Sequence, residues 1–271
     1  MSAPAPTLHC PCGRRHDVPA FTYDAPPEGE TRFDFSGPYR RRYLRCTVCE
    51  HWYSDTGMDL AGLYGGTYVN STYGERMRQT FERILALPAE KSDNSGRVAC
   101  VLAYAAKALR GVPSPTLLDV GSGLGVFPFR MSQAGWRCTA LDPDPRAAAH
   151  ARDVVGVEAM TGDFMALPES EVGTYDVITF NKVLEHVPDP VVMLRKAARH
   201  LKPGGFVYLE VPDVAAAAEG PRREEFFIEH YHVFSPESVA MMARHAGFIP
   251  VAVERVREPS SKFTLRAFVE P

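Results

Sequence analysis

The chain has 271 residues, of which 45% are hydrophobic and 23% are charged, as in a globular protein with a sizeable core. Its formal net charge of -3 excludes bulk electrostatic attraction to nucleic acid or to an acidic membrane. No stretch has the apolar length of a membrane span, and MSAPAPTLHC lacks the apolar core of a signal peptide. We therefore expect a cytoplasmic protein with six reduced cysteines, in which closely spaced pairs indicate metal rather than disulfides.

The first segment contains two closely spaced pairs of cysteines: Cys10, Cys12, Cys46 and Cys49. Four thiolates arranged in this way can surround one zinc ion, and four protein ligands make such a site closed and structural. Three histidines lie near enough in sequence to replace a thiolate: His9, His16 and His51. The alternative is four unrelated reduced cysteines, but this segment has too few apolar residues to fold without a metal. We predict a zinc-ribbon-like module over residues 1–55.

Residues 56–112 predict a helical connector. RMRQTFERILAL and GRVACVLAYAAKALRG repeat apolar residues at helical spacing, and Pro88 and SDNSG separate them. The preceding LYGGTYVNSTYGE carries three tyrosines among glycines: Tyr64, Tyr68 and Tyr73. Two interpretations are open for this segment, a packed connector between domains and a mobile lid over a ligand.

Strand patterns alternate with helical patterns over residues 113–271. The predicted strands are TLLDV, RCTALDP, VEAMTGDF, YDVITF, FVYLEVP, IPVAVERV and KFTLRAFVE. The predicted helices are VFPFRMSQAG, PRAAAHARDV, VVMLRKAARHLKPGG and PESVAMMARHAG, the last with Ser235 as its N-cap. This alternation is typical of an α/β fold with a doubly wound, mostly parallel sheet, in which ligands bind beyond the carboxyl ends of the strands.

The first of these strands runs into a glycine-rich turn, LLDVGSGLG. Its glycines are Gly121, Gly123 and Gly125, and position 126 is valine, so the dinucleotide spacing G-x-G-x-x-G is not met. A phosphate-binding loop is excluded because no Gly-Lys-Ser/Thr ending follows. Asp119 precedes the turn, where its charge would repel a diphosphate. We expect a ligand that approaches the backbone closely without being strongly anionic.

Three acids lie at or near the ends of successive predicted strands: Asp119, Asp142 and Asp163. Asp142 is placed to accept hydrogen bonds from both hydroxyls of a ribose. Asp163 with Phe164 can hold the amine of an adenine and stack on its ring. Asp119 and the glycine turn would face an amino-acid and sulfonium portion, and S-adenosylmethionine combines all these groups. A turn that only joins a strand to a helix would explain the glycines but not the ordered acids.

These motifs resemble the class I S-adenosylmethionine-dependent methyltransferases, with a Rossmann-like fold over residues 113–271. LLDVGSGLG is similar to their first motif, ALDPD to their ribose-binding acid and GDF to their adenine contact. FNKVLEHVPDP and LKPGGFVYLEVP resemble the small-molecule branch, and the resemblance adds Asn181 to the cofactor-binding residues. The cysteine pairs with LYGGTY resemble branch members that have an N-terminal zinc-binding segment, many of which act on sugars or secondary metabolites. The resemblance implies methyl transfer from S-adenosylmethionine to a small-molecule acceptor.

Candidates for a catalytic base follow the fourth and fifth predicted strands. NKVLEH supplies Glu185 and His186, and FFIEHYHVFSP supplies His230, Tyr231 and His232. A base is required only where the acceptor must lose a proton. In an extended stretch His230 and His232 would share one face, opposite Tyr231, and His230 is the expected acceptor contact. The alternatives are packing roles for all three, a packing or cofactor-side role for His186, and a metal on the two histidines, for which no third ligand is evident.

Two other functions compete with a small-molecule methyltransferase. The first is an RNA methyltransferase with a zinc module, in which YRRRYLR would be the basic patch and its aromatic residues would stack on bases. The net charge of -3 and the lack of an Asn/Asp-Pro-Pro-aromatic signature in NKVLEH oppose it. The second is a cofactor-binding module without catalysis, which the presence of all three acids and all three glycines opposes.

Overall fold

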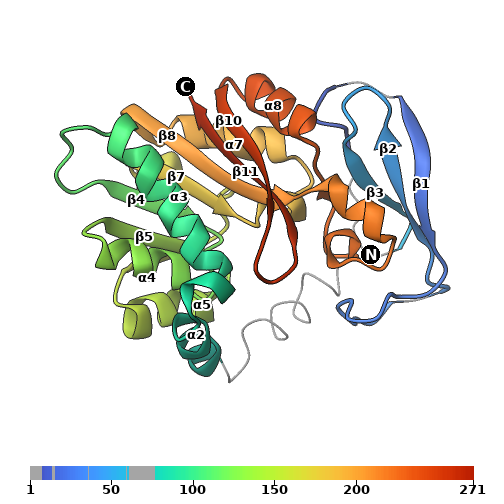
Figure 1. Cartoon of the computed structure of the whole chain (residues 1–271), viewed down its shortest axis with the longest axis horizontal. Helices are drawn as coiled ribbons and strands as arrows, with labels where there is room; N and C mark the ends of the chain where they lie inside the picture. Colours follow the sequence, from blue (N-terminus) through green and yellow to red (C-terminus); the bar gives the residue numbers. More distant parts are fainter. Residues whose placement is uncertain (1–7, 14–15, 36, 59, 61–76) are drawn as a thin grey trace.

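The computed structural model describes residues 8–13, 16–35, 37–58, 60 and 77–271. The larger part of the chain forms a seven-stranded sheet in the order β10-β11-β8-β7-β4-β5-β6 (Figure 1). Its strands are β4 (Thr116–Val120), β5 (Arg137–Asp142), β6 (Glu158–Thr161), β7 (Tyr175–Asn181), β8 (Leu201–Pro212), β10 (Ile249–Arg257) and β11 (Phe263–Glu270). Strands β4 to β8 pair in parallel, and β11 is antiparallel to both its neighbours. The predicted doubly wound, mostly parallel sheet is confirmed.

Helices cover both faces of this sheet because alternate strand residues point to opposite sides. The helices are α2 (Met77–Leu85), α3 (Asp93–Ala108), α4 (Val126–Gln133), α5 (Pro145–His150), α6 (Glu169–Val172), α7 (Pro190–Ala198) and α8 (Pro236–His245). Leu117 of β4 packs in a cluster with residues of α3 and α4, whereas the next residue, Leu118, packs in a second cluster with residues of α7 and α8. Across the described residues, no helix is both long enough and apolar enough to cross a membrane.

Shorter helical turns join these elements: η2 (Ala89–Lys91), η3 (Ala151–Val155), η4 (Leu184–His186), η5 (Val214–Glu219) and η6 (Glu224–Phe226). Of these, η3 is a π-helical continuation of α5, and η4 directly follows the end of β7. The chain order of the strands reverses at β4, which lies between β5 and β7. In a doubly wound sheet this reversal opens a crevice at the carboxyl ends of the central strands.

Two predicted boundaries are wrong. SDNSG was expected to lie between two helices, but it forms the beginning of α3. Ser92 is the N-cap of this helix, and its side chain accepts a hydrogen bond from the Ser95 amide. The helix predicted through LKPGG ends at Ala198, and Leu201 already begins β8. There Gly205 lies so close to β7 that a Cβ atom would be 2.6 Å from the Asp176 carbonyl oxygen. The predicted N-cap Ser235 is confirmed, with a capping box to Ser238.

A second, antiparallel sheet of four strands forms in the N-terminal part, in the order β1-β2-β3-β9 (Figure 1). Its strands are β1 (Asp17–Tyr23), β2 (Arg41–Cys46), β3 (Trp52–Thr56) and β9 (His232–Val233). The last strand comes from the segment between β8 and α8, which no sequence pattern predicted. A mostly aromatic cluster that includes Tyr43, Trp52 and Phe226 therefore packs N-terminal residues against residues of the larger part.

Candidate active site

The turn after β4 requires glycine for two reasons. Gly121, Gly123 and Gly125 have φ angles of 69°, 54° and 68°, in the left-handed region that side chains disfavour. A Cβ atom at Gly121 would lie 2.6 Å from Val183 Cγ2, and one at Gly125 would lie 2.8 Å from Val155 Cγ2. The turn therefore holds the first turn of α4 close to the carboxyl edge of the sheet.

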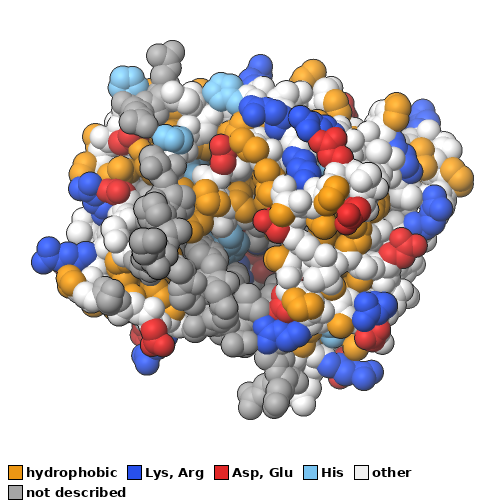
Figure 2. Space-filling model, turned by 180° about the vertical axis from the view of Figure 1, so that it is seen from behind, with side chains coloured by type: hydrophobic (Ala, Val, Ile, Leu, Met, Phe, Trp, Pro, Cys, Tyr) orange, Lys and Arg blue, Asp and Glu red, His pale blue; other side chains and the backbone are white. Residues whose placement is uncertain are grey.

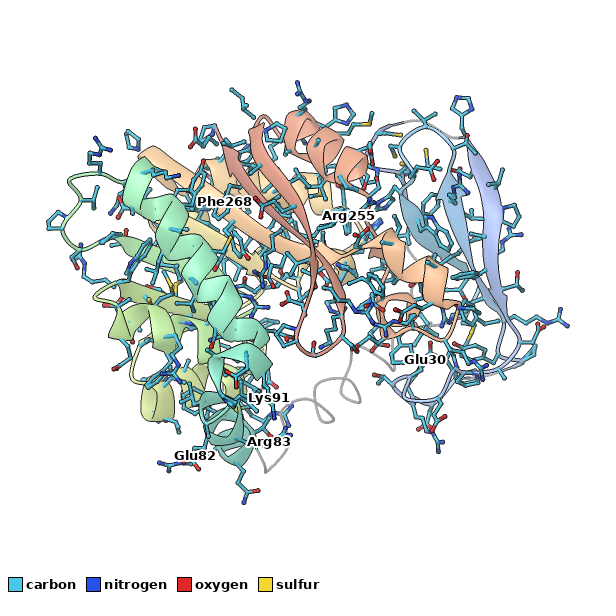
Figure 3. All side chains as sticks on the ribbon, viewed as in Figure 1. Glu30, Glu82, Arg83, Lys91, Arg255 and Phe268 are labelled. Atoms are coloured by element: carbon cyan, nitrogen blue, oxygen red, sulfur yellow. The ribbon has the colours of Figure 1, made fainter. Side chains whose placement is uncertain are left out.

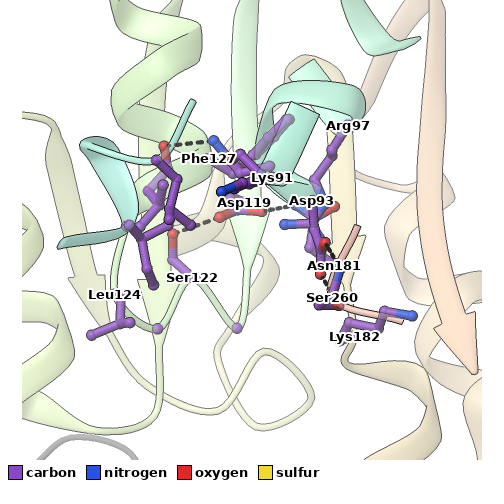
Figure 4. Close-up of a pocket in the computed structure, with 18 residues that line it drawn as sticks. Lys91, Asp93, Arg97, Asp119, Ser122, Leu124, Phe127, Asn181, Lys182 and Ser260 are labelled. Atoms are coloured by element: carbon purple, nitrogen blue, oxygen red, sulfur yellow. Dashed lines mark hydrogen bonds between the residues drawn. The ribbon is translucent and has the colours of Figure 1, made fainter. Parts of the chain in front are cut away.

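Asp119 is a buried centre of hydrogen bonds beneath this turn (Figure 4). Its carboxylate accepts hydrogen bonds from Ser122 Oγ at 2.6 Å, Thr179 Oγ1 at 2.6 Å and Asn181 Nδ2 at 2.8 Å. Burial raises the pKa of Asp119, although these three bonds act in the opposite direction. The Oδ1 atom of Asn181 is buried without a hydrogen-bond partner among the described residues. Asp119 thus orients Asn181 and leaves an acceptor atom to face a ligand.

Asp142, at the end of β5, is 4% exposed and fixes the glycine turn from the other side. One carboxylate oxygen accepts a hydrogen bond from the Gly123 amide at 2.9 Å, and the other accepts one from the Asp144 amide at 2.9 Å. Burial raises the pKa of Asp142. Because each carboxylate oxygen can accept two hydrogen bonds, both retain capacity for a ligand's hydroxyls.

A cavity of about 410 Å³ opens beside Asp142, and Asp163 and Phe164 form part of its wall. Asp163 is exposed, and its side chain accepts a hydrogen bond from the Met165 amide at 2.9 Å. Phe164 is buried, with its ring edge-on to the rings of Phe180 and His200. The Phe164 ring therefore belongs to the hydrophobic core as well as to the cavity wall.

A second cavity of about 390 Å³ lies on the other side of the glycine turn, where Asp119 and Asn181 line it (Figure 4). Further polar residues that the sequence analysis did not single out also line it, among them Lys91, Asp93, Arg97 and Ser260. Ser260 belongs to the hairpin between β10 and β11, and its hydroxyl donates to Asp93 at 2.5 Å. The tip of that hairpin therefore closes this cavity against the start of α3.

Arg97 lines this cavity and belongs to a buried network of ion pairs. Its guanidinium contacts the Glu210 carboxylate at 2.5 Å, and Arg266 contacts the same carboxylate at 3.0 Å. Burial alone would raise the pKa of Glu210, but Arg97, Lys182 and Arg266 together outweigh burial and lower the pKa to about 2. Arg266 also forms a second ion pair, with Glu258. Arg97 is therefore one of several buried cations beside the cavity.

The sequence pattern already marked both residues of the ion pair between Arg97 and Glu210 as unusual. Arg97 lies four and eight residues before Val101 and Ala105, which are buried, so it occupies the apolar stripe of α3. Glu210 lies inside the apolar run FVYLEVP. A charged residue on an apolar stripe and another in a buried strand indicate a pair that the fold brings together.

A third cavity, of about 220 Å³, adjoins the cavity beside Asp142. His230 and Glu185 line it, and Lys182 and His186 line both this cavity and the one beside Asp142. Lys182, which the sequence analysis missed, has a left-handed backbone with φ of 62°. Its ammonium donates to Thr264 Oγ1 at 2.6 Å. The third cavity thus adjoins the predicted cofactor site, with Lys182 and His186 between them.

The two histidines in the third cavity are held in the same way. His186 Nδ1 lies 2.8 Å from the carbonyl oxygen of Glu229, and His230 Nδ1 lies 3.0 Å from that of Glu225. A carbonyl oxygen only accepts, so in both rings Nδ1 carries the proton and, in the neutral ring, Nε2 carries the lone pair. Burial lowers the pKa of His230 well below its usual value of 6.5, which keeps that ring neutral near pH 7.

The expectation that His230 and His232 share a face is wrong. The chain turns before β9, which begins only at His232, so the side chains do not alternate as in a strand. His232 instead lies 3.0 Å from His51 of the N-terminal part, through Nδ1 and Nε2. Tyr231 packs in the mostly aromatic cluster of the small sheet. Of these three candidates, only His230 lines the cavity.

The four cysteines meet at the end of the small sheet. Cys10 Sγ lies 3.2 Å from the Sγ atoms of both Cys12 and Cys49, and Cys12 Sγ lies 3.7 Å from that of Cys46. All four sulfur atoms lie within 4.8 Å of one another, which fits one tetrahedral ion with bonds of about 2.3 Å. His51 is engaged elsewhere, with His232, so the cluster needs no histidine.

The strand order, the glycine turn and the buried carboxylates of Asp119 and Asp142 define a class of protein that binds an adenosyl ligand at the edge of a Rossmann-like sheet. Residues 71–253 match the family model described as a methyltransferase domain. The chain therefore belongs to that family, and within it to the class I S-adenosylmethionine-dependent methyltransferases.

Curated relatives match parts of the chain. The ubiquinone biosynthesis O-methyltransferase of Xanthomonas campestris pv. campestris (strain B100) is 34% identical over 112 residues, which cover 40% of this chain and 47% of that protein. The cypemycin N-terminal methyltransferase of a Streptomyces species is 32% identical over 152 residues, covering 54% of this chain and 58% of that protein. The chain thus spans about half of the length of these relatives.

Solved structures share the fold at low sequence identity. Magnesium protoporphyrin IX methyltransferase from Synechocystis PCC 6803 with bound S-adenosylhomocysteine has a TM-score of 0.57 at 16% identity, covering 75% of this chain and 98% of that one. The 1,6-didemethyltoxoflavin-N1-methyltransferase of Burkholderia thailandensis also has a TM-score of 0.57, at 19% identity, covering 82% and 95%. Both comparisons support the fold.

Proposed function

We propose that the chain transfers the methyl group of S-adenosylmethionine to a small-molecule acceptor. The observation that carries this proposal is that two cavities adjoin: Lys182 and His186 line both the cavity beside Asp142 and the 220 Å³ cavity that contains His230. In this proposal the cofactor lies along the carboxyl edge of the sheet, and the reacting group of the acceptor enters the 220 Å³ cavity. The relatives and solved neighbours with small-molecule names agree with such an acceptor.

The cofactor-binding residues follow from their positions. Asp142 would accept hydrogen bonds from the ribose hydroxyls, and Asp163 with Phe164 would border the adenine. Asp119, Asn181 and the glycine turn would border the methionine portion. S-adenosylmethionine supplies a methyl group that is already activated by its sulfonium, so the protein chiefly positions the acceptor against it. Positioning of this kind contributes roughly 7–11 kcal/mol to catalysis.

Arg97 would bind the carboxylate of the cofactor's amino-acid portion. It lines the 390 Å³ cavity, and its Nε atom is buried without a hydrogen-bond partner in the described part of the chain. Arg97→Met should therefore weaken S-adenosylhomocysteine binding by about 10-fold or more, the range for a charged hydrogen bond. Binding of 5′-methylthioadenosine, which lacks the amino acid, should stay unchanged. An equal loss for both ligands in calorimetry would contradict this role.

His230 is the residue that we propose to act on the acceptor, with His186 second. Both line the 220 Å³ cavity, and burial keeps His230 neutral. His232 and Tyr231 have packing roles in this proposal. Replacing His230 by Gln should abolish turnover while leaving the melting temperature and S-adenosylhomocysteine affinity unchanged. The same turnover as wild type would remove His230 from the mechanism and leave His186.

The Arg-rich run favours a small acceptor over RNA. Arg41 is buried and paired with Glu30, which lies in the N-terminal part (Figure 3). Arg42 contacts Asp55 at 2.5 Å, and Arg45 contacts a carboxylate of the following turn at 2.7 Å. These pairs reduce the positive charge that would attract phosphates, because they involve three of the four arginines of the run. A salt-sensitive gel shift with an RNA transcript would instead support the RNA methyltransferase.

We further propose that the cysteine cluster holds a structural zinc ion in a reducing cytoplasm. Residues 1–55 would form the zinc module, 56–112 the connector and 113–271 the methyltransferase domain. The distances between the sulfur atoms support the ion. Strand β9 of the methyltransferase domain pairs with β3 and completes the sheet of the zinc module. Tyr64, Tyr68 and Tyr73, for which the sequence left a lid and a packed connector open, lie outside the described residues.

The direct test of the function is methyl transfer from labelled S-adenosylmethionine. Pools of hydroxylated and amine-bearing small molecules and, separately, an RNA transcript are offered as acceptors. Label should appear in a small-molecule product and be lost in the Gly121→Ala variant, because its Cβ atom would lie 2.6 Å from Val183 Cγ2. Label in RNA alone, or cofactor binding with no transfer to any acceptor, would contradict the proposal.

A further inference from the structure

The 220 Å³ cavity contains a group of side chains suited to a metal ion. Glu185, His186 and His230 each offer one ligand atom, and these atoms lie within 4.8 Å of one another. Small side-chain rotations would bring them to the bond lengths of about 2.0–2.2 Å that a divalent cation requires. Figure 2 shows the face opposite to that of Figure 1, hollowed near its centre, with histidine and acidic side chains inside the hollow. The cluster is separate from the four cysteines.

The ligand atoms of Glu185, His186 and His230 indicate which class of metal ion this site would bind. Two imidazoles and one carboxylate bind first-row transition metals and leave several coordination positions open. Both imidazoles have Nδ1 held by a backbone carbonyl, His186 by that of Glu229 and His230 by that of Glu225. Such second contacts fix the ring orientation and the tautomer of metal-binding histidines. In the neutral rings the lone pair is on Nε2, the atom that would bind the ion.

Glu185 provides an independent observation. It is 1% exposed, and its Oε2 atom has no hydrogen-bond partner among the residues described. A charged carboxylate is costly to bury without compensation. A bound cation would compensate that cost at the unpartnered oxygen beside the two histidines.

We infer that Glu185, His186 and His230 bind one divalent transition-metal ion, whose open positions hold oxygen atoms of the acceptor. The acceptor part of this inference rests on the proposed function, whereas the metal part does not. A cation next to an acceptor hydroxyl lowers its pKa, so the ion would do the work that the sequence analysis assigned to a histidine base. An acceptor with two neighbouring oxygen atoms suits two open positions.

The experiment uses Mn²⁺ as the probe, because Mn²⁺ prefers oxygen and nitrogen ligands over the thiolates of the cysteine cluster. Loss of the signal of free Mn²⁺ in electron paramagnetic resonance counts the bound ions on the full chain. We expect one Mn²⁺ per wild-type chain. Glu185→Gln and His230→Gln should each weaken binding by at least about 10-fold, since even indirect changes near a metal cost 10- to 100-fold.

The matched control is Glu224→Gln, which removes a carboxylate from the same cavity but outside the cluster. It should bind Mn²⁺ as wild type does, and melting temperatures should show that each variant folds. Absence of Mn²⁺ binding, or equal binding by wild type, Glu185→Gln and His230→Gln, would overturn the inference. The proposed function is judged separately by S-adenosylhomocysteine binding and methyl transfer. Turnover that needs His230 but no metal would leave the histidine acting as the base.

Discussion

The seven-stranded sheet and the four-stranded sheet of this chain are stabilised in different ways. Helices cover both faces of the large sheet (Figure 1), and the sheet lies between two clusters of buried hydrophobic residues, one on each face. The small sheet has one mostly aromatic cluster, and four cysteines close its end. Its last strand, β9, and part of its cluster come from the larger part of the chain.

This difference implies a one-way dependence. The large sheet buries enough apolar surface on both faces to be stable through the hydrophobic effect. The small sheet needs both the proposed metal and the strand that the larger part supplies. Loss of the metal should therefore unfold only the small sheet, whereas loss of the large sheet should unfold both. The two tryptophans of the chain report on the two regions, because Trp52 lies in the small-sheet cluster and Trp136 in a large-sheet cluster.

Zinc removal should have the largest effect. A structural zinc ion contributes about 10–16 kcal/mol of apparent binding energy in zinc-finger peptides. In Trp136→Phe protein, chelation should shift the fluorescence of Trp52 to that of an exposed ring. In Trp52→Phe protein, the fluorescence of Trp136 should not change.

Elemental analysis provides the control for this prediction. Cys46→Ser should lose both the zinc and the folded signal of Trp52, whereas Cys100→Ser, outside the cluster, should keep one zinc per chain. A zinc-free protein in which Trp52 remains buried would contradict the metal-dependent half of the comparison.

Creating a cavity in the core of the large sheet by substitution should have the next largest effect on stability. Leu118 is fully buried in β4, and Leu118→Ala should lower the free energy of unfolding by about 2–5 kcal/mol. Val112→Ala, at an exposed position, should change it by less than about 0.5 kcal/mol. Denaturant unfolding should show the Leu118→Ala shift at both tryptophans. A shift at Trp136 alone would mean that the small sheet does not depend on the large one.

Acidic pH should weaken the contact between His51 of the N-terminal part and His232 of the larger part. Burial lowers the pKa of His232 to about 4 from 6.5, and it also lowers the pKa of His51. The unfolded chain then binds more protons between these values, so the free energy of unfolding falls as the pH decreases from 6.5 towards about 4. For His232 the loss is on the order of 3 kcal/mol.

Urea unfolding followed by Trp52 fluorescence at neutral and acidic pH measures this loss. The pH dependence should become flatter in His232→Gln, which cannot be protonated, and should stay the same in His16→Gln, an exposed position. Equal pH dependence in wild type and His232→Gln would show that this histidine does not set the acid sensitivity.

The cofactor side was predictable because its contacts join motifs whose order and spacing are visible in the sequence. Asp142 accepts from the Gly123 amide, and both residues were singled out from the ends of neighbouring predicted strands. The roles in cofactor binding stay predictions. Even here the sequence missed Arg97, whose partner Glu210 lies on a distant strand, although both carried an unexpected charge in an apolar pattern.

The proposed acceptor cavity was less predictable because it is assembled from separate segments. Lys182, His186 and His230 come from the turns after β7 and before β9. The assumption of an extended strand gave His230 and His232 a common face, but the chain turns between them and His51 fixes His232 instead. Tertiary contacts of this kind leave no periodic pattern. A two-residue strand such as β9 is also too short to show one.

The central claim, that the carboxyl edge of the large sheet binds S-adenosylmethionine through Asp142, is tested most directly by calorimetry with S-adenosylhomocysteine. Asp142→Ala should weaken binding by about 1.5–3 kcal/mol, the range for hydrogen bonds to a charged group. The shape-conserving Asp142→Asn should weaken it less, and Asp153→Ala, at an exposed carboxylate, should not weaken it. Unchanged affinity in a folded Asp142→Ala protein, or no binding by wild type, would contradict the account.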